Sequence, residues 1–129
     1  MKKMTALLLA VLMVLSMAAC ASKPAEESDL AYIQDKGTLV VGITDFAPMD
    51  YQNESGEWIG FDADLAKAFA ESLGVKVEFV EIVWDNKVLE LDSKTIDCVW
   101  NGMTLTSEVT SAMACSNAYC NNAQVIVTK

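Results

Sequence analysis

The 129-residue chain contains no histidine and no arginine. Without histidine it cannot form the Ser-His-Asp or Cys-His groups of common nucleophilic enzymes, or a histidine metal site. Without arginine it lacks the bidentate guanidinium that clamps carboxylates and phosphates. Its 9 basic residues stand against 18 acidic ones, and a formal charge of −9 is the opposite of what nucleic-acid-binding proteins carry. These absences exclude most hydrolase mechanisms and make DNA and RNA poor partners.

The first 20 residues have the pattern of an export signal. Two lysines precede an unbroken apolar run, Ala6–Leu15, and small residues then lead to Cys20. The run is too short for a membrane-spanning helix, which needs roughly 20 apolar residues. Because Met-Ala-Ala-Cys resembles a bacterial lipobox, we expect residues 1–19 to be a lipoprotein signal peptide, Cys20 to be lipidated, and residues 20–30 to form a flexible tether. A plain secretory signal with an incidental cysteine is the alternative.

Three cysteines follow Cys20, namely Cys98, Cys115 and Cys120. A disulfide is permitted outside the cytosol, but three thiols leave one unpaired. The bridge would join Cys115 to Cys120, or Cys98 to either of them, and three free thiols are the other alternative. Three cysteines without histidine also make a poor zinc set.

Residues 38–83 alternate between strand and helix patterns. Thr38–Ile43 is a β-branched apolar run that predicts a buried parallel strand. Gly60-Phe61-Asp62 opens a helix in which Asp62 can serve as the N-cap, and Gly74 supplies the stop. Val75–Val83 predicts a second strand, so that a right-handed β-α-β unit follows. We expect the helix to bury one apolar face, made of Leu65, Ala66, Phe69 and Leu73.

Four further elements complete the predicted α/β fold. They are a short helix at Lys87–Leu91, a third central strand at Ile96–Trp100, a helix at Ser107–Met113 capped by Thr106, and a last strand at Gln124–Thr128. The alternation of strands and helices indicates a mostly parallel sheet. In such folds, ligands bind outside the carboxyl ends of the strands.

Three loops follow the predicted strands, and we expect them to lie side by side: residues 44–51, 83–86 and 101–106. They offer one anion, two flat apolar walls and three hydrogen-bonding side chains. These are Asp45, then Phe46 and Trp84, then Asn101, Thr104 and Thr106. Together they predict a site for a small polar ligand. The alternatives are that Asp45 only orders a turn, that both aromatics belong to the core, and that Thr106 only caps a helix.

Five sequence blocks resemble, in the same order, the extracytoplasmic solute-binding proteins of family 3, the receptors of polar amino acid ABC importers. They are Gly37–Met49 (GTLVVGITDFAPM), Gly56–Ala66 (GEWIGFDADLA), Leu91–Asp97 (LDSKTID), Met103–Thr106 (MTLT) and Cys115–Tyr119 (CSNAY). The resemblance implies two α/β lobes of the type II periplasmic-binding-protein kind that close on one solute. It covers only the first lobe, at residues 31–129. We therefore expect the second lobe to be missing, the chain to be a fragment, and its binding alone to be weak.

The resemblance also implies roles for single residues. Phe46 corresponds to an aromatic residue that stacks on the ligand, and Asn101, Gly102 and Thr104 correspond to the strand-end group. Asn101 and Thr104 would hydrogen-bond the α-amino or α-carboxylate group. Members that bind α-amino acids typically place an arginine where this chain has Val109. Either N–H groups at the start of the last predicted helix hold the carboxylate, or the solute is not an ordinary α-amino acid.

The implied function is the substrate-binding component of an ABC importer for amino acids or similar small polar solutes. The protein would be lipid-anchored at the extracytoplasmic face of the membrane, with permease and ATPase subunits as partners. It would need no cofactor and no metal, and it would have no catalysis of its own. One alternative is a single-lobe sensory or interaction lipoprotein without a transport role. Another is a dehydratase-like enzyme of the same fold, for which Asp45 and Glu108 would be the candidate acid–base pair.

Overall fold

The computed structural model describes residues 28–123 and 125–129. The predicted signal peptide, the lipidation site Cys20 and most of the tether therefore lie outside the described residues. The chain divides into two units, residues 1–32 and 33–129. The first described helix, α2 (Asp29–Lys36), includes residues of both units, so the predicted tether ends in a helix. Within the described part of the chain, no helix is long and apolar enough to cross a membrane.

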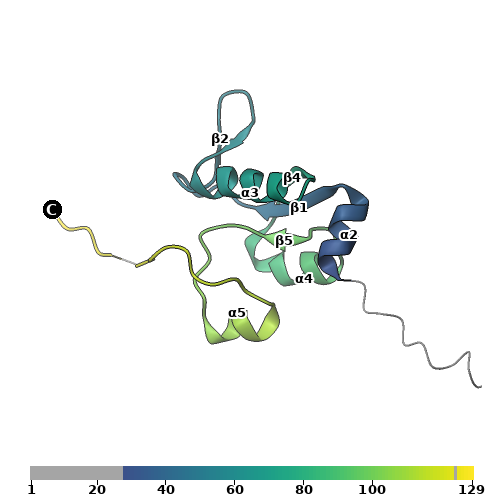
Figure 1. The fold of residues 1–129 in the computed structure, drawn as a ribbon. Helices are drawn as coiled ribbons and strands as arrows, with labels where there is room; N and C mark the ends of the chain where they lie inside the picture. Colours follow the sequence, from purple (N-terminus) through teal and green to yellow (C-terminus); the bar gives the residue numbers. More distant parts are fainter. Residues whose placement is uncertain (1–27, 124) are drawn as a thin grey trace, which may run out of the picture. The chain divides into compact units, whose positions relative to one another are not determined.

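A three-stranded parallel sheet forms the centre of residues 33–129 (Figure 1). Its middle strand is β1 (Thr38–Ile43), which pairs with β4 (Lys76–Glu81) on one side and β5 (Cys98–Val99) on the other. The side chains of Leu39, Val41 and Ile43 are at most 2% exposed. A central parallel strand is covered on both faces, which explains the nearly continuous apolar sequence of β1. The predicted α/β class with a parallel sheet is confirmed.

Helix α3 (Phe61–Ser72) packs on the sheet through its smallest side chains. Ala63, Ala66 and Ala70 are at most 1% exposed, whereas Leu65 and Phe69 are 37% and 44% exposed. The prediction that Leu65 and Phe69 belong to the buried face is therefore wrong. Alanines let the helix lie close to the strands, and the face that carries them turns the larger side chains outward.

Glycines define both ends of α3. Gly74 follows the helix with a φ of 74°, a left-handed conformation that glycine adopts without strain, so the predicted stop is confirmed. At the start, Gly60 holds the N-cap position with a φ of 116°, and a Cβ there would lie 2.7 Å from the Pro48 carbonyl oxygen. The predicted capping role of Asp62 is wrong. Asp62 lies within the first turn, and its side chain is fully buried instead of reaching back to the helix end.

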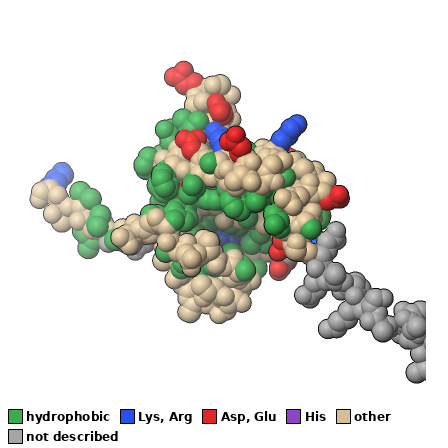
Figure 2. All heavy atoms as spheres, in the orientation of Figure 1, with side chains coloured by type: hydrophobic (Ala, Val, Ile, Leu, Met, Phe, Trp, Pro, Cys, Tyr) green, Lys and Arg blue, Asp and Glu red, His purple; other side chains and the backbone are tan. Residues whose placement is uncertain are grey.

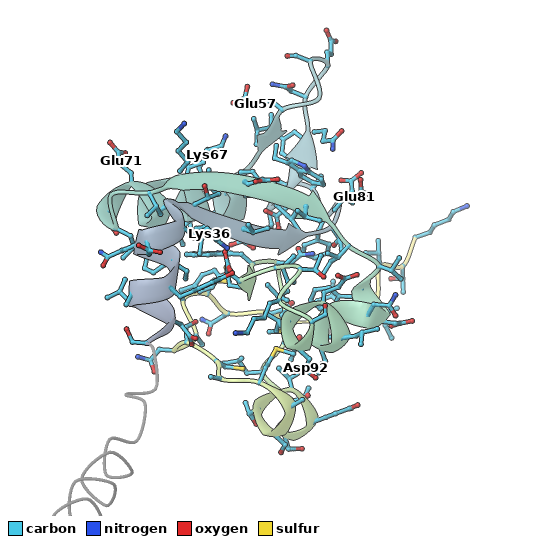
Figure 3. The ribbon with its side chains drawn as sticks, turned by 90° about the vertical axis from the view of Figure 1, so that its right-hand side faces the viewer. Lys36, Glu57, Lys67, Glu71, Glu81 and Asp92 are labelled. Carbon is cyan, nitrogen blue, oxygen red and sulfur yellow. The ribbon has the colours of Figure 1, made fainter. Side chains whose placement is uncertain are left out.

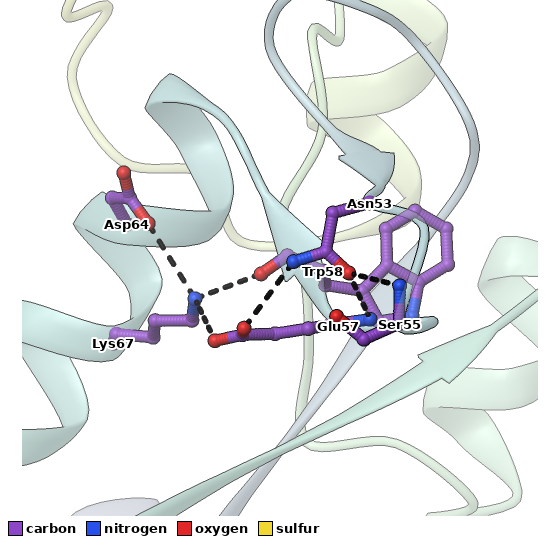
Figure 4. A network of polar contacts seen from close by, with 6 residues as sticks. All are labelled: Asn53, Ser55, Glu57, Trp58, Asp64 and Lys67. Atoms are coloured by element: carbon purple, nitrogen blue, oxygen red, sulfur yellow. Dashed lines mark hydrogen bonds and ion pairs between the residues drawn. The ribbon is translucent and has the colours of Figure 1, made fainter.

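A two-stranded antiparallel hairpin precedes α3 and has no counterpart in the sequence prediction. Its strands are β2 (Tyr51–Gln52) and β3 (Trp58–Ile59). Lys67 of α3 fastens the hairpin, since its Nζ donates to the Trp58 carbonyl at 2.7 Å (Figure 4). The same Nζ lies 3.5 Å from carboxylate oxygens of Glu57 and Asp64. The hairpin therefore closes one end of the core, where the Trp58 side chain is buried.

Two further helices agree with the sequence prediction, namely α4 (Lys87–Asp92) and α5 (Ser107–Ala112). The 3-10 turn η1 (Trp84–Asn86) lies in a stretch that was predicted only as a loop. Thr106 Oγ1 accepts the Val109 N–H at 3.3 Å, which confirms Thr106 as the cap of α5. Lys36, labelled in Figure 3, lies at the end of α2, and its Nζ is 2.7 Å from Asp97 Oδ2. The same oxygen accepts the Val40 N–H at 2.7 Å. This ion pair joins α2 to the strands β1 and β5.

Two strand predictions differ from the structure. The third strand is Cys98–Val99 rather than Ile96–Trp100, although the N–H groups on either side of it still bond to β1 carbonyls. The predicted last strand at Gln124–Thr128 is wrong for residues 125–128, which form no strand, while residue 124 lies outside the described residues. The side chains of residues 125–127 are 79% to 93% exposed. β-branched residues form strands where a neighbouring strand and a buried face receive them, and this segment has neither among the described residues.

Candidate functional site

A cleft of about 680 Å³ lies beside β5 and beyond its carboxyl end. Its walls are residues 97–105, which include β5, and a later stretch, residues 113–122, which we call the wall segment. Figure 2 shows hydrophobic side chains gathered above a hollow in the surface. Other lining residues are Ile33, Leu39, Phe46, Met49, Phe69 and Leu91. Both the position and the volume suit a small-molecule site of an α/β protein.

Asn101 joins the loop after β1 to the loop after β5. Its side chain is buried, its Nδ2 donates to Thr44 Oγ1, and its Oδ1 accepts the Gly102 N–H at 3.0 Å. The first and third predicted loops therefore lie side by side as expected. Because both ends of the Asn101 amide already have partners, its main contribution is to hold the two loops together.

Phe46 forms a half-exposed flat wall of the cleft. Its ring lies directly against Gly102, where an added Cβ would come within 2.6 Å of Phe46 Cε1. Glycine at position 102 therefore makes room for the ring. The Phe46 backbone is fixed as well, because its N–H donates to the Asp50 carbonyl at 2.6 Å. With 51% of the residue exposed, the ring has a face available for stacking.

Thr104 joins the two walls of the cleft. Its Oγ1 accepts a hydrogen bond from Asn122 Nδ2 at 3.1 Å, and both residues line the cleft. The structure thus brings Phe46, Asn101, Gly102 and Thr104 around one cavity. Their role in binding a ligand stays a prediction.

The other three predicted site residues lie outside the lining of this cleft. Asp45 is exposed and does not line it. Trp84 faces Lys87, whose Nζ lies 4.6 Å from the ring centroid, so the second predicted loop does not join the other two at the cavity. Thr106 caps α5, which was the alternative to a ligand-binding role for this residue. A loop after a strand points toward the sheet edge, but its length and turns decide which side chains reach the cavity.

Cys98, Cys115 and Cys120 all line the cleft, and all three are free thiols. The alternative of three free thiols therefore describes the structure. Burial, with the nearby charge of Asp97, raises the pKa of the Cys98 thiol to about 12. Among the described residues, no group of three or more Cys, Asp or Glu side chains is placed to hold a metal ion.

Sequence reasoning missed a pair of buried aspartates behind the cleft. Asp50 and Asp62 are both 0% exposed, and Tyr119 of the wall segment donates its O–H to Asp62 Oδ1 at 2.8 Å. Burial, and then the charge of Asp62, raise the pKa of Asp50 to about 7, while the nearby Ala63 N–H opposes this. Burial also raises the pKa of Asp62, against the effect of the Tyr119 hydrogen bond. In the sequence, Asp62 belonged to a family block and was given a role only as a helix cap, and Asp50 gave no signal.

Comparison with known proteins gives a consistent family match. The model of the bacterial extracellular solute-binding proteins, family 3, matches residues 39–129. L-cystine-binding protein TcyJ of Escherichia coli is 35% identical over 85 residues, which are 65% of this chain and 32% of TcyJ. Arginine-binding extracellular protein ArtP of Bacillus subtilis is 32% identical over 130 residues, which are 100% of this chain and 49% of ArtP.

One curated relative is an enzyme, and one solved structure is a single lobe. Cyclohexadienyl dehydratase of Pseudomonas aeruginosa is 37% identical over 95 residues, covering 73% of this chain and 35% of the enzyme. The arginine-bound form of domain 1 from TmArgBP, as the Phe57Trp mutant, matches with a TM-score of 0.61 and 40% identity, covering 64% of each chain. This chain spans about a third to a half of the length of the three curated relatives.

Proposed function

Because this chain belongs to the bacterial extracellular solute-binding proteins of family 3, we propose that it forms the first lobe of an amino acid receptor for an ABC importer. The solute would bind in the cleft between residues 97–105 and the wall segment. The observation that carries this proposal is the placement of Phe46 on Gly102 at the mouth of a cavity of about 680 Å³. An aromatic face beside hydrogen-bonding groups is the usual design of a small polar ligand site.

Each lining residue would have a defined part in binding. The exposed face of Phe46 would stack on the solute, and Thr104 would exchange its Asn122 partner for a polar group of the solute. Asn101 would act chiefly by keeping the loops in place. No arginine is present, and the Val109 N–H is already bonded to Thr106, so the start of α5 has one donor fewer for a carboxylate. The strongly acidic chain further favours a zwitterionic or cationic solute over an anionic one.

The relatives support an amino acid as the solute. Their names describe proteins that bind arginine and cystine, and the domain 1 structure shows that one lobe of a relative has been seen in an arginine-bound form. A single lobe offers fewer contacts than a closed pair, so we expect this chain to bind more weakly than a two-lobe receptor.

Binding is also favoured over dehydration chemistry. The curated dehydratase keeps catalysis open for this family. The candidate acid–base pair, Asp45 and Glu108, does not line the cleft, so neither carboxylate is placed to exchange a proton with a solute bound there.

The lipid anchor and the transport partners belong to the same proposal. Cys20 would carry the lipid and hold the protein at the extracytoplasmic face of the membrane, beside permease and ATPase subunits. The intact mass of the native protein from the membrane fraction tests the anchor. A mass increased by a diacylglyceryl group at Cys20 supports it, and an unmodified Cys20 contradicts it.

Calorimetric titration with L-arginine, L-cystine and L-histidine tests the binding site. We expect saturable binding of at least one of them, and a loss of about tenfold in affinity, roughly 1.4 kcal/mol, in both Phe46→Ala and Thr104→Ala. Trp84→Ala serves as the control, because it removes an aromatic side chain outside the cleft. Equal affinity in all four proteins would show that the solute binds elsewhere.

A further inference from the structure

Asp50 and Asp62 are buried close to one another without a basic partner. Both oxygens of Asp50 and Oδ2 of Asp62 lack a hydrogen-bond partner of good geometry among the described residues. The Ala63 N–H at the start of α3 lies near Asp50 and opposes the rise of its pKa, but burial and the charge of Asp62 outweigh it. The side chains of both aspartates are 0% exposed, so bulk water does not reach them. An isolated buried charge is costly, and two such charges beside each other are costlier still. The fold therefore requires that part of this negative charge be neutralised.

The elements packed around the pair supply no cation to neutralise it. In α3, the nearest base is Lys67, which is directed to the Trp58 carbonyl, Glu57 and Asp64 (Figure 4). Strand β1 has no titratable side chain, and the hairpin strands β2 and β3 contribute only Tyr51. The wall segment contributes Tyr119, and the charge of the neighbouring Cys120 thiol adds to the rise of the Tyr119 pKa. A proton is the positive charge that remains available at this place within the described part of the chain.

We propose that Asp50 keeps a proton beside the ionised Asp62, and that this proton allows Asp62 to anchor the wall segment through Tyr119. Release of the proton would loosen one wall of the cleft. The pKa of Asp50, raised to about 7 by burial and by the charge of Asp62, places this release near neutral pH. The proposal depends on the proposed function only for what the cleft binds.

Tyr119 connects the buried pair to the cleft. Its hydroxyl bonds to Asp62 at 2.8 Å, its ring lies 6.3 Å from the ring of Phe61 at an interplanar angle of 30°, and the residue lines the cleft. When both aspartates are ionised, their mutual repulsion and the cost of keeping them away from water destabilise the packing in which Tyr119 covers them. Water that enters to solvate the carboxylates competes with the Tyr119 hydroxyl. Loss of this contact frees the middle of the wall segment.

NMR titration of the purified protein with ¹³C-labelled aspartate carboxyls tests the proton on Asp50 directly. We expect one aspartate carboxyl to titrate with a midpoint near 7, and the amide signals of Tyr119 and Cys120 to move with the same midpoint. The wild-type titration is decisive without any variant. If every aspartate carboxyl titrates below about pH 5.5, or if Tyr119 does not respond to the neutral titration, the proposal is overturned.

Two variants assign the titration to its residue. Asp50→Asn keeps the shape of the side chain and cannot ionise, so both the carboxyl signal near 7 and the response of Tyr119 should disappear. Asp64→Asn is the matched control, because Asp64 lies two residues from Asp62 on the same helix with its side chain 69% exposed. It should retain both responses. A neutral titration that survives Asp50→Asn would refute the assignment.

Solute titrations at about pH 6 and pH 8.5 connect the switch to the cleft. We expect a several-fold lower affinity at the higher pH for the wild type and for Asp64→Asn, and equal affinity at both pH values for Asp50→Asn. Absence of solute binding at both pH values contradicts the proposed function and leaves the NMR result standing. Binding with the same affinity at both pH values, together with a neutral titration of Asp50, would show that the wall does not act on the ligand.

Discussion

Replacement of Asp50 by asparagine should change how the stability of the protein depends on pH. The folded state raises the pKa of Asp50 from 3.8 to about 7, so it binds this proton more tightly than the unfolded state does. Stability from this group is therefore greatest below about pH 4, where both states are protonated. It falls as the pH rises, and it becomes constant above about pH 7, where both states have lost the proton.

The size of the effect follows from the same shift. A difference of about three pKa units corresponds to about 4 kcal/mol in the free energy of unfolding, since each unit is worth about 1.4 kcal/mol. About half of it, roughly 2 kcal/mol, should be lost between pH 5.5 and pH 8. An asparagine side chain cannot ionise, so the Asp50→Asn variant loses this dependence. The buried amide of the variant still lacks partners and costs about 1–3 kcal/mol at every pH.

Urea denaturation at pH 5.5 and pH 8 measures the effect, because few other acidic groups titrate in this window. The wild type should be less stable at pH 8 by roughly 2 kcal/mol. The free energy of unfolding of Asp50→Asn should differ little between the two pH values. Relative to the wild type, the variant should therefore become more stable as the pH rises. Asp64→Asn, which changes an exposed aspartate of α3, should behave as the wild type does. If Asp50→Asn keeps the full pH dependence of the wild type, Asp50 is not the group responsible for it.

Three further substitutions test the cleft, the sheet and the last helix. Gly102→Ala places a Cβ 2.6 Å from Phe46 Cε1, so the ring must move. Calorimetry should then show about a tenfold weaker solute affinity. An unchanged affinity would mean that the position of the ring is unimportant for binding. Asp97→Ala removes the acceptor of Lys36 and of the Val40 N–H and should cost about 2–4 kcal/mol in urea denaturation, whereas the exposed Asp92→Ala should cost almost nothing. Thr106→Ala removes the cap of α5 and should lower the protection of α5 amides from hydrogen exchange by about 1 kcal/mol; unchanged protection would argue against the cap.

Much of the fold could be predicted from the sequence because its signals are local. β1 is an apolar β-branched run between a glycine and polar residues, and the structure gives it the bounds Thr38–Ile43 that were predicted. Gly74 ends α3 and Thr106 caps α5 for the reasons that hold for any helix. These features depend on residues within one turn of each other, so no tertiary information is needed to find them.

The errors arose where tertiary contacts decide the outcome. The large side chains Leu65 and Phe69 suggested a buried face, but close contact with the sheet selected the alanines of α3. The apolar residues 125–127 suggested a strand, but strand formation needs a neighbour that the described residues do not supply. The hairpin of β2 and β3 escaped prediction because each strand has only two residues.

The candidate site divides in the same way. Phe46, Asn101 and Thr104 were found because they follow β1 and β5, whose carboxyl ends lie side by side in a parallel sheet. Gly102 was found only through the family resemblance. Trp84 follows β4, which lies on the far side of β1 from β5, and it does not line the cleft. The burial of Asp50 and its proximity to Asp62 were outside the reach of sequence reasoning, because charged residues are seldom buried without a partner.

Amide NMR during titration with L-arginine is the most direct test of solute binding at the cleft. We predict saturable shifts centred on Phe46, Gly102 and Thr104 and on the wall segment, with the amide of Trp84 unaffected. If arginine, cystine and histidine produce no saturable shifts, or if the shifts centre on Trp84 and the end of β4, the cleft is not the binding site of this lobe.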